Sequence, residues 1–190
     1  MKHLAILASG AGSNAQKIID QFRESSLAKV SLIICNKAEA GVLQIAVREH
    51  IPSLLISRHS LYETDEVLTR LKLLHVHWIV LAGFLWKVPG KLIAAFPRRI
   101  INIHPALLPK YGGKGMYGMR VHEAVIAHGE KESGITIHYI NEQYDEGEMI
   151  LQKTCSVSPE DTPESLAQKV HQLEYAWYPQ TIEKLIRENK

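Results

Sequence analysis

The stretch HLAILASGAGSNA, residues His3–Ala15, decides the fold of this 190-residue chain. Its apolar first part, His3–Ala8, predicts a buried β-strand, and helix-period apolar positions follow over Ala15–Phe22. The turn between them fits the pattern G-x-G-x-x-G/A, and the unpaired N–H groups that begin the following helix can bind an anion. The stretch therefore predicts a phosphate-binding turn in an α/β fold. The alternative is a strand–helix turn that uses Gly and Asn only for its geometry.

Short apolar runs alternate with longer amphipathic segments through the first two-thirds of the chain. Near-continuous apolar strands between helices predict a doubly wound, mostly parallel sheet of Rossmann-like type with helices on both faces. The further strands are expected at Val30–Cys35, Ser53–Ile56, Trp78–Ala82 and Ile100–Ile103, and the further helical segments at Ala40–His50 and Thr64–Leu74.

The pattern changes after residue 104. Thr162 and Pro163 are typical N-cap and first-turn residues of a long C-terminal helix. No linker or internal repeat divides the chain, so we expect one domain over residues 1–190. Before the last helix the sequence predicts a Gly- and Pro-rich loop over Pro105–Arg120, a short helix over Val121–His128, strands over Gly134–Ile140 and Met149–Val157, and a polar connection over Asn141–Glu148.

The composition is that of an ordinary globular protein, with 46% hydrophobic residues and a net charge of +2. Such a small excess of charge predicts neither a nucleic-acid nor a membrane partner. No apolar run approaches the roughly 18 residues of a membrane span, and no cleavable signal precedes the first strand. We therefore expect a cytoplasmic protein whose two cysteines, Cys35 and Cys155, are buried free thiols.

The phosphate-binding turn does not by itself predict a dinucleotide site. A NAD site has an acidic residue at the end of the second strand, where this chain reads Cys35-Asn36-Lys37. Ser13 and Asn14 add side-chain donors that suit a single phosphomonoester. The sequence thus favours a phosphorylated small substrate, and Lys37 leaves an NADP site as an alternative.

A polar pair ends the predicted central strand. Alternation places Asn102 and His104 on one side of it, at the edge where open α/β sheets bind ligands. A carboxamide and an imidazole at that edge can stabilise an oxyanion and move a proton. The alternative is an Asn that holds a loop and a His at the end of a strand. The local sequence of Asp145 favours a turn residue, although its carboxylate could hold an imidazole.

Other polar residues give weaker signals. His75 and His77 have no third ligand at a useful spacing, so no metal site is predicted. His122 and His128 lie on different faces of a short predicted helix, and we assign them no role. Whether the cations in the Gly-rich loop attract an anionic substrate or are only solvated stays open; they are Lys110, Lys114 and Arg120.

Four motifs together resemble the folate-dependent phosphoribosylglycinamide formyltransferase family in order and spacing: Ser9–Asn14, Ala82-Gly83-Phe84, Asn102–Tyr111 and Asp145-Glu146-Gly147. The Asn-x-His…Leu-Leu-Pro signature alone also occurs in methionyl-tRNA formyltransferases and formyltetrahydrofolate deformylases, which usually carry a further domain for which we expect no room here. The resemblance implies formyl transfer from 10-formyltetrahydrofolate to the amine of phosphoribosylglycinamide in purine biosynthesis. It implies no metal, and a monomer or homodimer.

The resemblance also implies roles for individual residues. Asn102, His104 and Asp145 match the catalytic positions, and Asp145 would keep His104 protonated near neutral pH. Implied substrate-binding residues are Gly12, Ser13, Asn14, His171 and Glu174. Implied folate-binding residues are Leu85, Trp86, Lys87, Val88, Asn102, Asn141, Glu142, Gln143, Tyr144 and Asp145.

The chain departs from the family pattern at three places. Trp86 stands where some relatives have Arg, and Arg58–Tyr62 lacks a clear match to a folate-contacting Arg. The loop Tyr111–Arg120 is longer and richer in Gly than the form typical of the family. These departures concern folate affinity and loop closure.

Three other functions stay open. A hydrolase of 10-formyltetrahydrofolate would release formate without an amine substrate, although it would have no use for a phosphate-binding turn. An NADP-dependent oxidoreductase would use Gly10–Ala15 and Lys37. A ligand-binding module without catalysis would not depend on Asn102 or Asp145.

Overall fold

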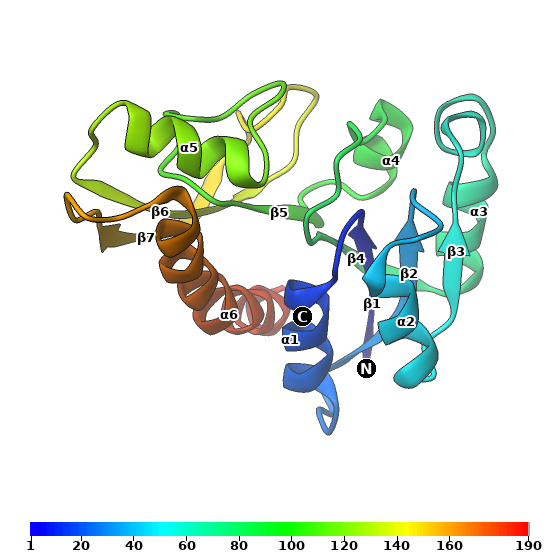
Figure 1. The fold of residues 1–190 in the computed structure, drawn as a ribbon. Helices are drawn as coiled ribbons and strands as arrows, with labels where there is room; N and C mark the ends of the chain where they lie inside the picture. Colours follow the sequence, from blue (N-terminus) through cyan, green and yellow to red (C-terminus); the bar gives the residue numbers. More distant parts are fainter. Residues whose placement is uncertain (190) are drawn as a thin grey trace.

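The computed structural model describes residues 1–189, and in that range seven strands form one sheet in the order β3-β2-β1-β4-β5-β6-β7 (Figure 1). Strands β1 to β5 are parallel, and β6 and β7 add antiparallel neighbours beyond β5. This is the mostly parallel, Rossmann-like sheet that the sequence predicts. The strands are β1 (Lys2–Ala8), β2 (Ala28–Cys35), β3 (Ser53–Leu55), β4 (Val76–Leu81), β5 (Ile100–His104), β6 (Glu132–Tyr139) and β7 (Met149–Ser156).

Helices cover both faces of the sheet, as predicted. Alternation along β1 shows the two faces, because Leu4 and Ile6 enter one apolar cluster, whereas Ala5 and Leu7 enter the other. Helices α1, α2, α5 and α6 contribute to the first cluster, and η1, α3 and α4 to the second. The helices are α1 (Ser13–Phe22), α2 (Gly41–Arg48), the π-helical turn η1 (His59–Glu63), α3 (Glu66–Leu73), α4 (Gly90–Ala95), α5 (Met119–Ala127) and α6 (Pro163–Glu188).

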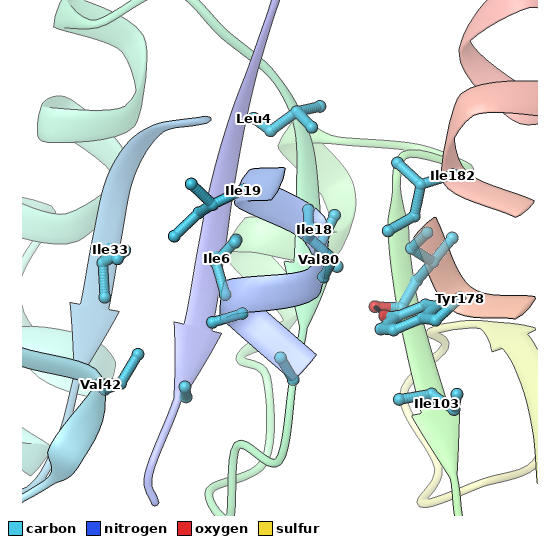
Figure 2. Close-up of a cluster of buried hydrophobic side chains, with 14 of the residues drawn as sticks. Leu4, Ile6, Ile18, Ile19, Ile33, Val42, Val80, Ile103, Tyr178 and Ile182 are labelled. Carbon is cyan, nitrogen blue, oxygen red and sulfur yellow. Dashed lines mark hydrogen bonds between the residues drawn. The ribbon is translucent and has the colours of Figure 1, made fainter. Parts of the chain in front are cut away.

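Helix α6 is fixed to the centre of the sheet by Tyr178. Figure 2 shows Tyr178 and Ile182 beside Ile103 of β5. The fully buried hydroxyl of Tyr178 lies 2.8 Å from the Leu81 carbonyl oxygen and 3.2 Å from that of Ile101, so its single proton can be shared between the two acceptors. The contact sets the position of α6 relative to the ends of β4 and β5, where the candidate site lies.

The predicted start of α6 is confirmed. Thr162 accepts a hydrogen bond from the backbone N–H of Ser165, and the Ser165 hydroxyl accepts one from the N–H of Thr162, which completes a capping box. Figure 1 shows that α6 then runs beside α1, and the two helices are in contact.

Two expectations need correction. The sequence did not predict η1 or α4, whose five and six residues are too few to show a helical period. Cys35 is buried, but Cys155 on the edge strand β7 is only half-buried; both are free thiols. No helix among residues 1–189 is both long enough and apolar enough to cross a bilayer.

Candidate active site

The carboxyl ends of β1, β4 and β5 open into one cavity of about 800 Å³. Such an edge of a parallel sheet is where α/β folds bind ligands. The cavity brings together every site residue predicted from the sequence except Glu142, whose carboxylate turns toward Gly90. Its walls are Ser9–Asn14, Leu81–Val88, Asn102–Pro105, Gly113–Arg120, Ile140–Asp145 apart from Glu142, and single residues that include Lys37, His122, His171 and Glu174.

Four polar side chains form a cluster at this cavity: Asn102, His104 and Asp145 line it, and His138 is buried behind them. The Nδ2 atom of Asn102 lies 3.2 Å from Nε2 of His138, its partner across the β5–β6 ladder. The carboxylate of Asp145 lies between two imidazoles, 3.6 Å from Nδ1 of His104 and 3.6 Å from Nε2 of His138. The antiparallel strand β6 and the connection after it therefore bring Asp145 to His104, which the spacing along the chain could not show.

The backbone fixes the carboxylate of Asp145. This residue has a φ of 57° in the middle of the β6–β7 connection, a conformation that Asp adopts more readily than most residues. Its Oδ2 atom accepts a 2.9 Å hydrogen bond from the N–H of Gly113. This hydrogen bond links the Gly-rich loop to the β6–β7 connection beside the cluster of polar side chains.

The pKa of His104 lies below its ordinary value of 6.5 in this arrangement. Burial lowers the pKa of His104, and the negative charge of Asp145 and the carbonyl of Tyr111 only partly oppose that effect. The net direction runs against the expectation that Asp145 keeps His104 protonated, because the sequence does not reveal how deeply the imidazole is buried. Burial also raises the pKa of Asp145, but hydrogen bonds to His138 and to the backbone N–H of Gly113, together with the nearby His104, outweigh it, so the net pKa is lowered and Asp145 is a carboxylate.

Both ring nitrogens of His104 face hydrogen-bond acceptors. Nε2 lies 2.7 Å from the carbonyl oxygen of Tyr111, and Nδ1 lies near the Asp145 carboxylate. A neutral imidazole has one N–H and leaves one acceptor without a donor, whereas an imidazolium has a donor for each. The pair of acceptors therefore prepares His104 to take up a proton during a reaction.

One end of the cavity suits an anion. Gly12 has a φ of 86°, and a Cβ atom there would stand 2.8 Å from the Ile45 side chain and 2.9 Å from Val42, so glycine is required where α2 packs on the turn. No side chain caps α1, and the first-turn N–H groups of the helix are available to a ligand. Lys37, Lys114 and Arg120 also line the cavity, whereas Lys110 pairs with Glu130.

A buried hydrogen bond closes this end of the cavity. The Asn14 amide donates to the Glu174 carboxylate over 2.9 Å. Burial raises the pKa of Glu174, and the bond from Asn14 and the charge of His171 oppose the rise. Glu174 is 6% exposed, so its few polar neighbours decide its charge.

Another wall of the cavity is aromatic. Trp86 has the rings of Phe84 and Tyr62 at 6.3 and 6.5 Å, and the Arg58 guanidinium lies 5.1 Å from its ring centroid. The segment Arg58–Tyr62, which lacked a match in the family pattern, thus lies against the Trp86 wall. The Ser9 hydroxyl accepts a 2.9 Å hydrogen bond from the N–H of Leu85 and holds this wall to β1.

Comparison with known proteins agrees with this arrangement. The chain matches the family model described as formyl transferase over residues 2–182. It belongs to the formyl transferase family. Its structure superposes on the glycinamide ribonucleotide transformylase 1 of Symbiobacterium toebii with a TM-score of 0.89 and 32% identity, covering 99% of this chain and 89% of that one. The superposition on the phosphoribosylglycinamide formyltransferase of Bacillus halodurans has a TM-score of 0.88 and 35% identity, and it covers 100% of this chain and 97% of that one.

Curated sequences show the same relationship. The chloroplastic phosphoribosylglycinamide formyltransferase of Arabidopsis thaliana is 40% identical, over 95% of this chain and 64% of that protein. The chloroplastic enzyme of Vigna unguiculata is 42% identical, over 98% of this chain and 62% of that protein. This formyl transferase chain therefore spans less than two thirds of the two plant relatives. It spans 95% of the phosphoribosylglycinamide formyltransferase of Bacillus subtilis, which is 36% identical over 98% of this chain.

Sequence reasoning missed two histidines of this formyl transferase site. His138 alternates with the apolar residues of β6, and a pairing of β6 with β5 would have placed it opposite Asn102. His122, to which no role was assigned, is 2% exposed and lines the cavity. The apolar residues around His122 on this short helix gave no indication that its side chain lines the cavity. Among the described residues, no group of three or more His, Cys, Asp or Glu side chains is placed to hold a metal ion.

Proposed function

We propose that this formyl transferase moves the formyl group of 10-formyltetrahydrofolate to the amine of phosphoribosylglycinamide, a step of purine biosynthesis. One observation carries the proposal: a single cavity is lined by an anion-binding turn, by an aromatic wall, and by Asn102, His104 and Asp145. Two substrates bound from opposite ends would meet at these three side chains, and holding them together removes entropy from the barrier.

The acceptor substrate is proposed to bind at the α1 end. Its phosphate suits the uncapped start of α1, and the nearby cations add to the attraction. The folate is proposed to bind at the other end, between Leu85–Val88 and the β6–β7 connection, where aromatic and apolar side chains suit a flat ring system.

The residues between the two ends suit acyl transfer. The amine attacks the formyl carbon, and the Asn102 amide can donate to the oxyanion that forms. The neutral imidazole of His104 can take the proton that the amine loses. The resulting imidazolium would be stabilised by donating to both Asp145 and Tyr111, and it gives up one of these two contacts when it returns the proton to the leaving folate nitrogen.

An absorbance assay for the deformylated folate tests the proposal, run with a stable 10-formyl folate analogue with and without phosphoribosylglycinamide. We expect product only with the amine substrate, with a loss of about 10²–10³ in kcat for Asn102→Ala and a collapse of activity for His104→Ala. Product without the amine would identify a hydrolase. Absence of product under both conditions would reject formyl transfer.

We also propose that the protein acts in the cytoplasm on these small molecules, with no nucleic-acid or membrane partner and without a metal. We predict that the protein is a monomer or a homodimer. Light scattering on a sizing column separates the two, and a larger assembly would contradict both. Unchanged activity after dialysis against a chelator would support the metal-free proposal, and a loss that a metal salt restores would overturn it.

A further inference from the structure

His122 is a buried polar residue for which the proposed mechanism has no use. It lies on α5, where Val121 and Val125 on either side of it are also buried. Unlike those two residues, His122 lines the cavity. Its Nδ1 atom is shut off from solvent and has no hydrogen-bond partner among residues 1–189. A buried polar side chain that faces a substrate cavity and has no protein partner is a candidate for binding the substrate.

The surroundings of Nδ1 decide which nitrogen carries the proton. A neutral imidazole has one N–H and one acceptor nitrogen. A buried N–H without an acceptor is rarer in proteins than an acceptor without a donor. The proton therefore belongs on Nε2, which leaves an N–H as the polar group that His122 can offer to a bound molecule.

His122 is neutral near pH 7 and does not exchange protons with substrate. The pKa of His122 is lowered to about 4, chiefly by burial and to a smaller extent by the electrostatic effect of His171 and His104. These are the charged or titratable groups that face it from α6 and β5. The proposed mechanism assigns proton transfer to His104, whose two ring nitrogens face acceptors. The remaining role for His122 is therefore substrate binding.

The position of His122 indicates which substrate it contacts. Helix α5 packs on α6, which carries His171 and Glu174, and α6 packs on α1 at the anion-binding end. The folate wall is formed by other segments, Leu81–Val88 and the β6–β7 connection. Lys37, Lys114 and Arg120 supply the charges for a phosphate, so a neutral donor in their company suits an uncharged oxygen of the same substrate.

We propose that His122 is a substrate-binding residue whose Nε2–H donates a hydrogen bond to an uncharged oxygen of the phosphorylated amine substrate. The inference rests on the proposed function for the identity of that substrate. An amide carbonyl and the sugar oxygens are acceptors of this class in phosphoribosylglycinamide.

Steady-state kinetics of the full chain, with each substrate varied in turn, test the proposal. For His122→Leu we expect the KM for phosphoribosylglycinamide to rise about tenfold, the size of one neutral hydrogen bond. The KM for the folate donor and the pH profile of kcat should not change. His122→Gln, whose amide can place a donor near the former Nε2, should recover most of the affinity, whereas His122→Asn, with a shorter side chain, should not.

Val125→Ala is the matched control for packing, because it removes buried volume from the same helix without touching the cavity. It should lower the melting temperature without a selective rise in one KM. The proposal is overturned if His122→Gln binds as weakly as the Leu variant, if both KM values rise together, or if the pH profile of kcat moves.

Calorimetric titration with phosphoribosylglycinamide repeats the comparison without turnover. If the wild type binds this compound but does not formylate it, the proposed function fails while the ratio of Kd values still decides the role of His122. If the wild type formylates it and His122→Leu binds it as tightly, only the inference about His122 fails.

Discussion

The side-chain amide of Asn14 donates a 2.9 Å hydrogen bond to the buried carboxylate of Glu174, across 160 positions of the chain. The bond joins the first turn of α1 to the middle of α6, and both residues line the cavity. The anion-binding turn and the last helix therefore form one wall of the candidate site.

Asn14→Ala should destabilise the protein by about 1–3 kcal/mol, because Glu174 loses its donor while it stays buried. Burial already raises the pKa of Glu174, and loss of the Asn14 bond raises it further. A raised carboxyl pKa means that the folded state binds the proton more tightly, so stability falls as the pH rises above the ordinary value of 4.5. Urea unfolding should thus show a larger loss at pH 7.5 than at pH 5. Adding Glu174→Gln should remove this pH dependence; its persistence would contradict the explanation.

His122→Gln should protect the protein against acid. The folded-state pKa of His122 is about 4, below its ordinary value of 6.5, so between these values only the unfolded chain binds the proton. Stability is therefore lost as the pH falls from 6.5 toward 4. Between pH 7.5 and 4.5 the wild type should lose about 2–3 kcal/mol more unfolding free energy than the variant. Equal losses in urea titrations would show that His122 is not buried in its neutral form.

Gly12→Ala should cost about 2–4 kcal/mol, because the residue has a positive φ and the new Cβ would collide with Ile45 and Val42. Gly10→Ala is the control for stability: a Cβ there meets nothing within 4 Å, so we expect a change within about 0.5 kcal/mol. Thermal unfolding of both variants makes the comparison. Similar melting temperatures for the two would show that α2 does not pack on the turn as described.

Asp145→Asn should lower kcat about 10²–10⁴-fold, because the imidazolium of His104 loses its anionic partner. The charge of Asp145 raises the pKa of His104 against the effect of burial, so its removal lowers that pKa further. If neutral His104 is the base, the acid limb of the pH–rate profile lies below pH 6.5 and should move to still lower pH in the variant. An acid limb that moves to higher pH would show that Asp145 does not act by raising the pKa of His104.

Most of the fold could be predicted from the sequence, because its signals are local. Continuous apolar runs such as Val30–Cys35 show that a strand is buried on both faces, and the Gly12 turn shows where a strand passes into a helix. The short elements η1 and α4 could not be predicted, since they are shorter than the stretch over which a helical period becomes visible.

The site could be predicted only in part, because its geometry depends on contacts between distant residues. Alternation placed Asn102 and His104 on one face, and both line the cavity. The approach of Asp145 to His104 depends on the antiparallel pairing of β6 with β5, and only the family resemblance suggested it. The charge state of His104 and the burial of His122 depend on the depth of packing, which no spacing along the chain encodes.

Strand β5 has a parallel neighbour on one side and an antiparallel neighbour on the other. The anion-binding turn belongs to the parallel half of the sheet, and Asp145 to the connection beyond the antiparallel half. The two halves meet only at the strand that carries Asn102 and His104. In the proposed function, the phosphate contact is thus made from the parallel half of the sheet, and the carboxylate that faces His104 is supplied from the antiparallel half.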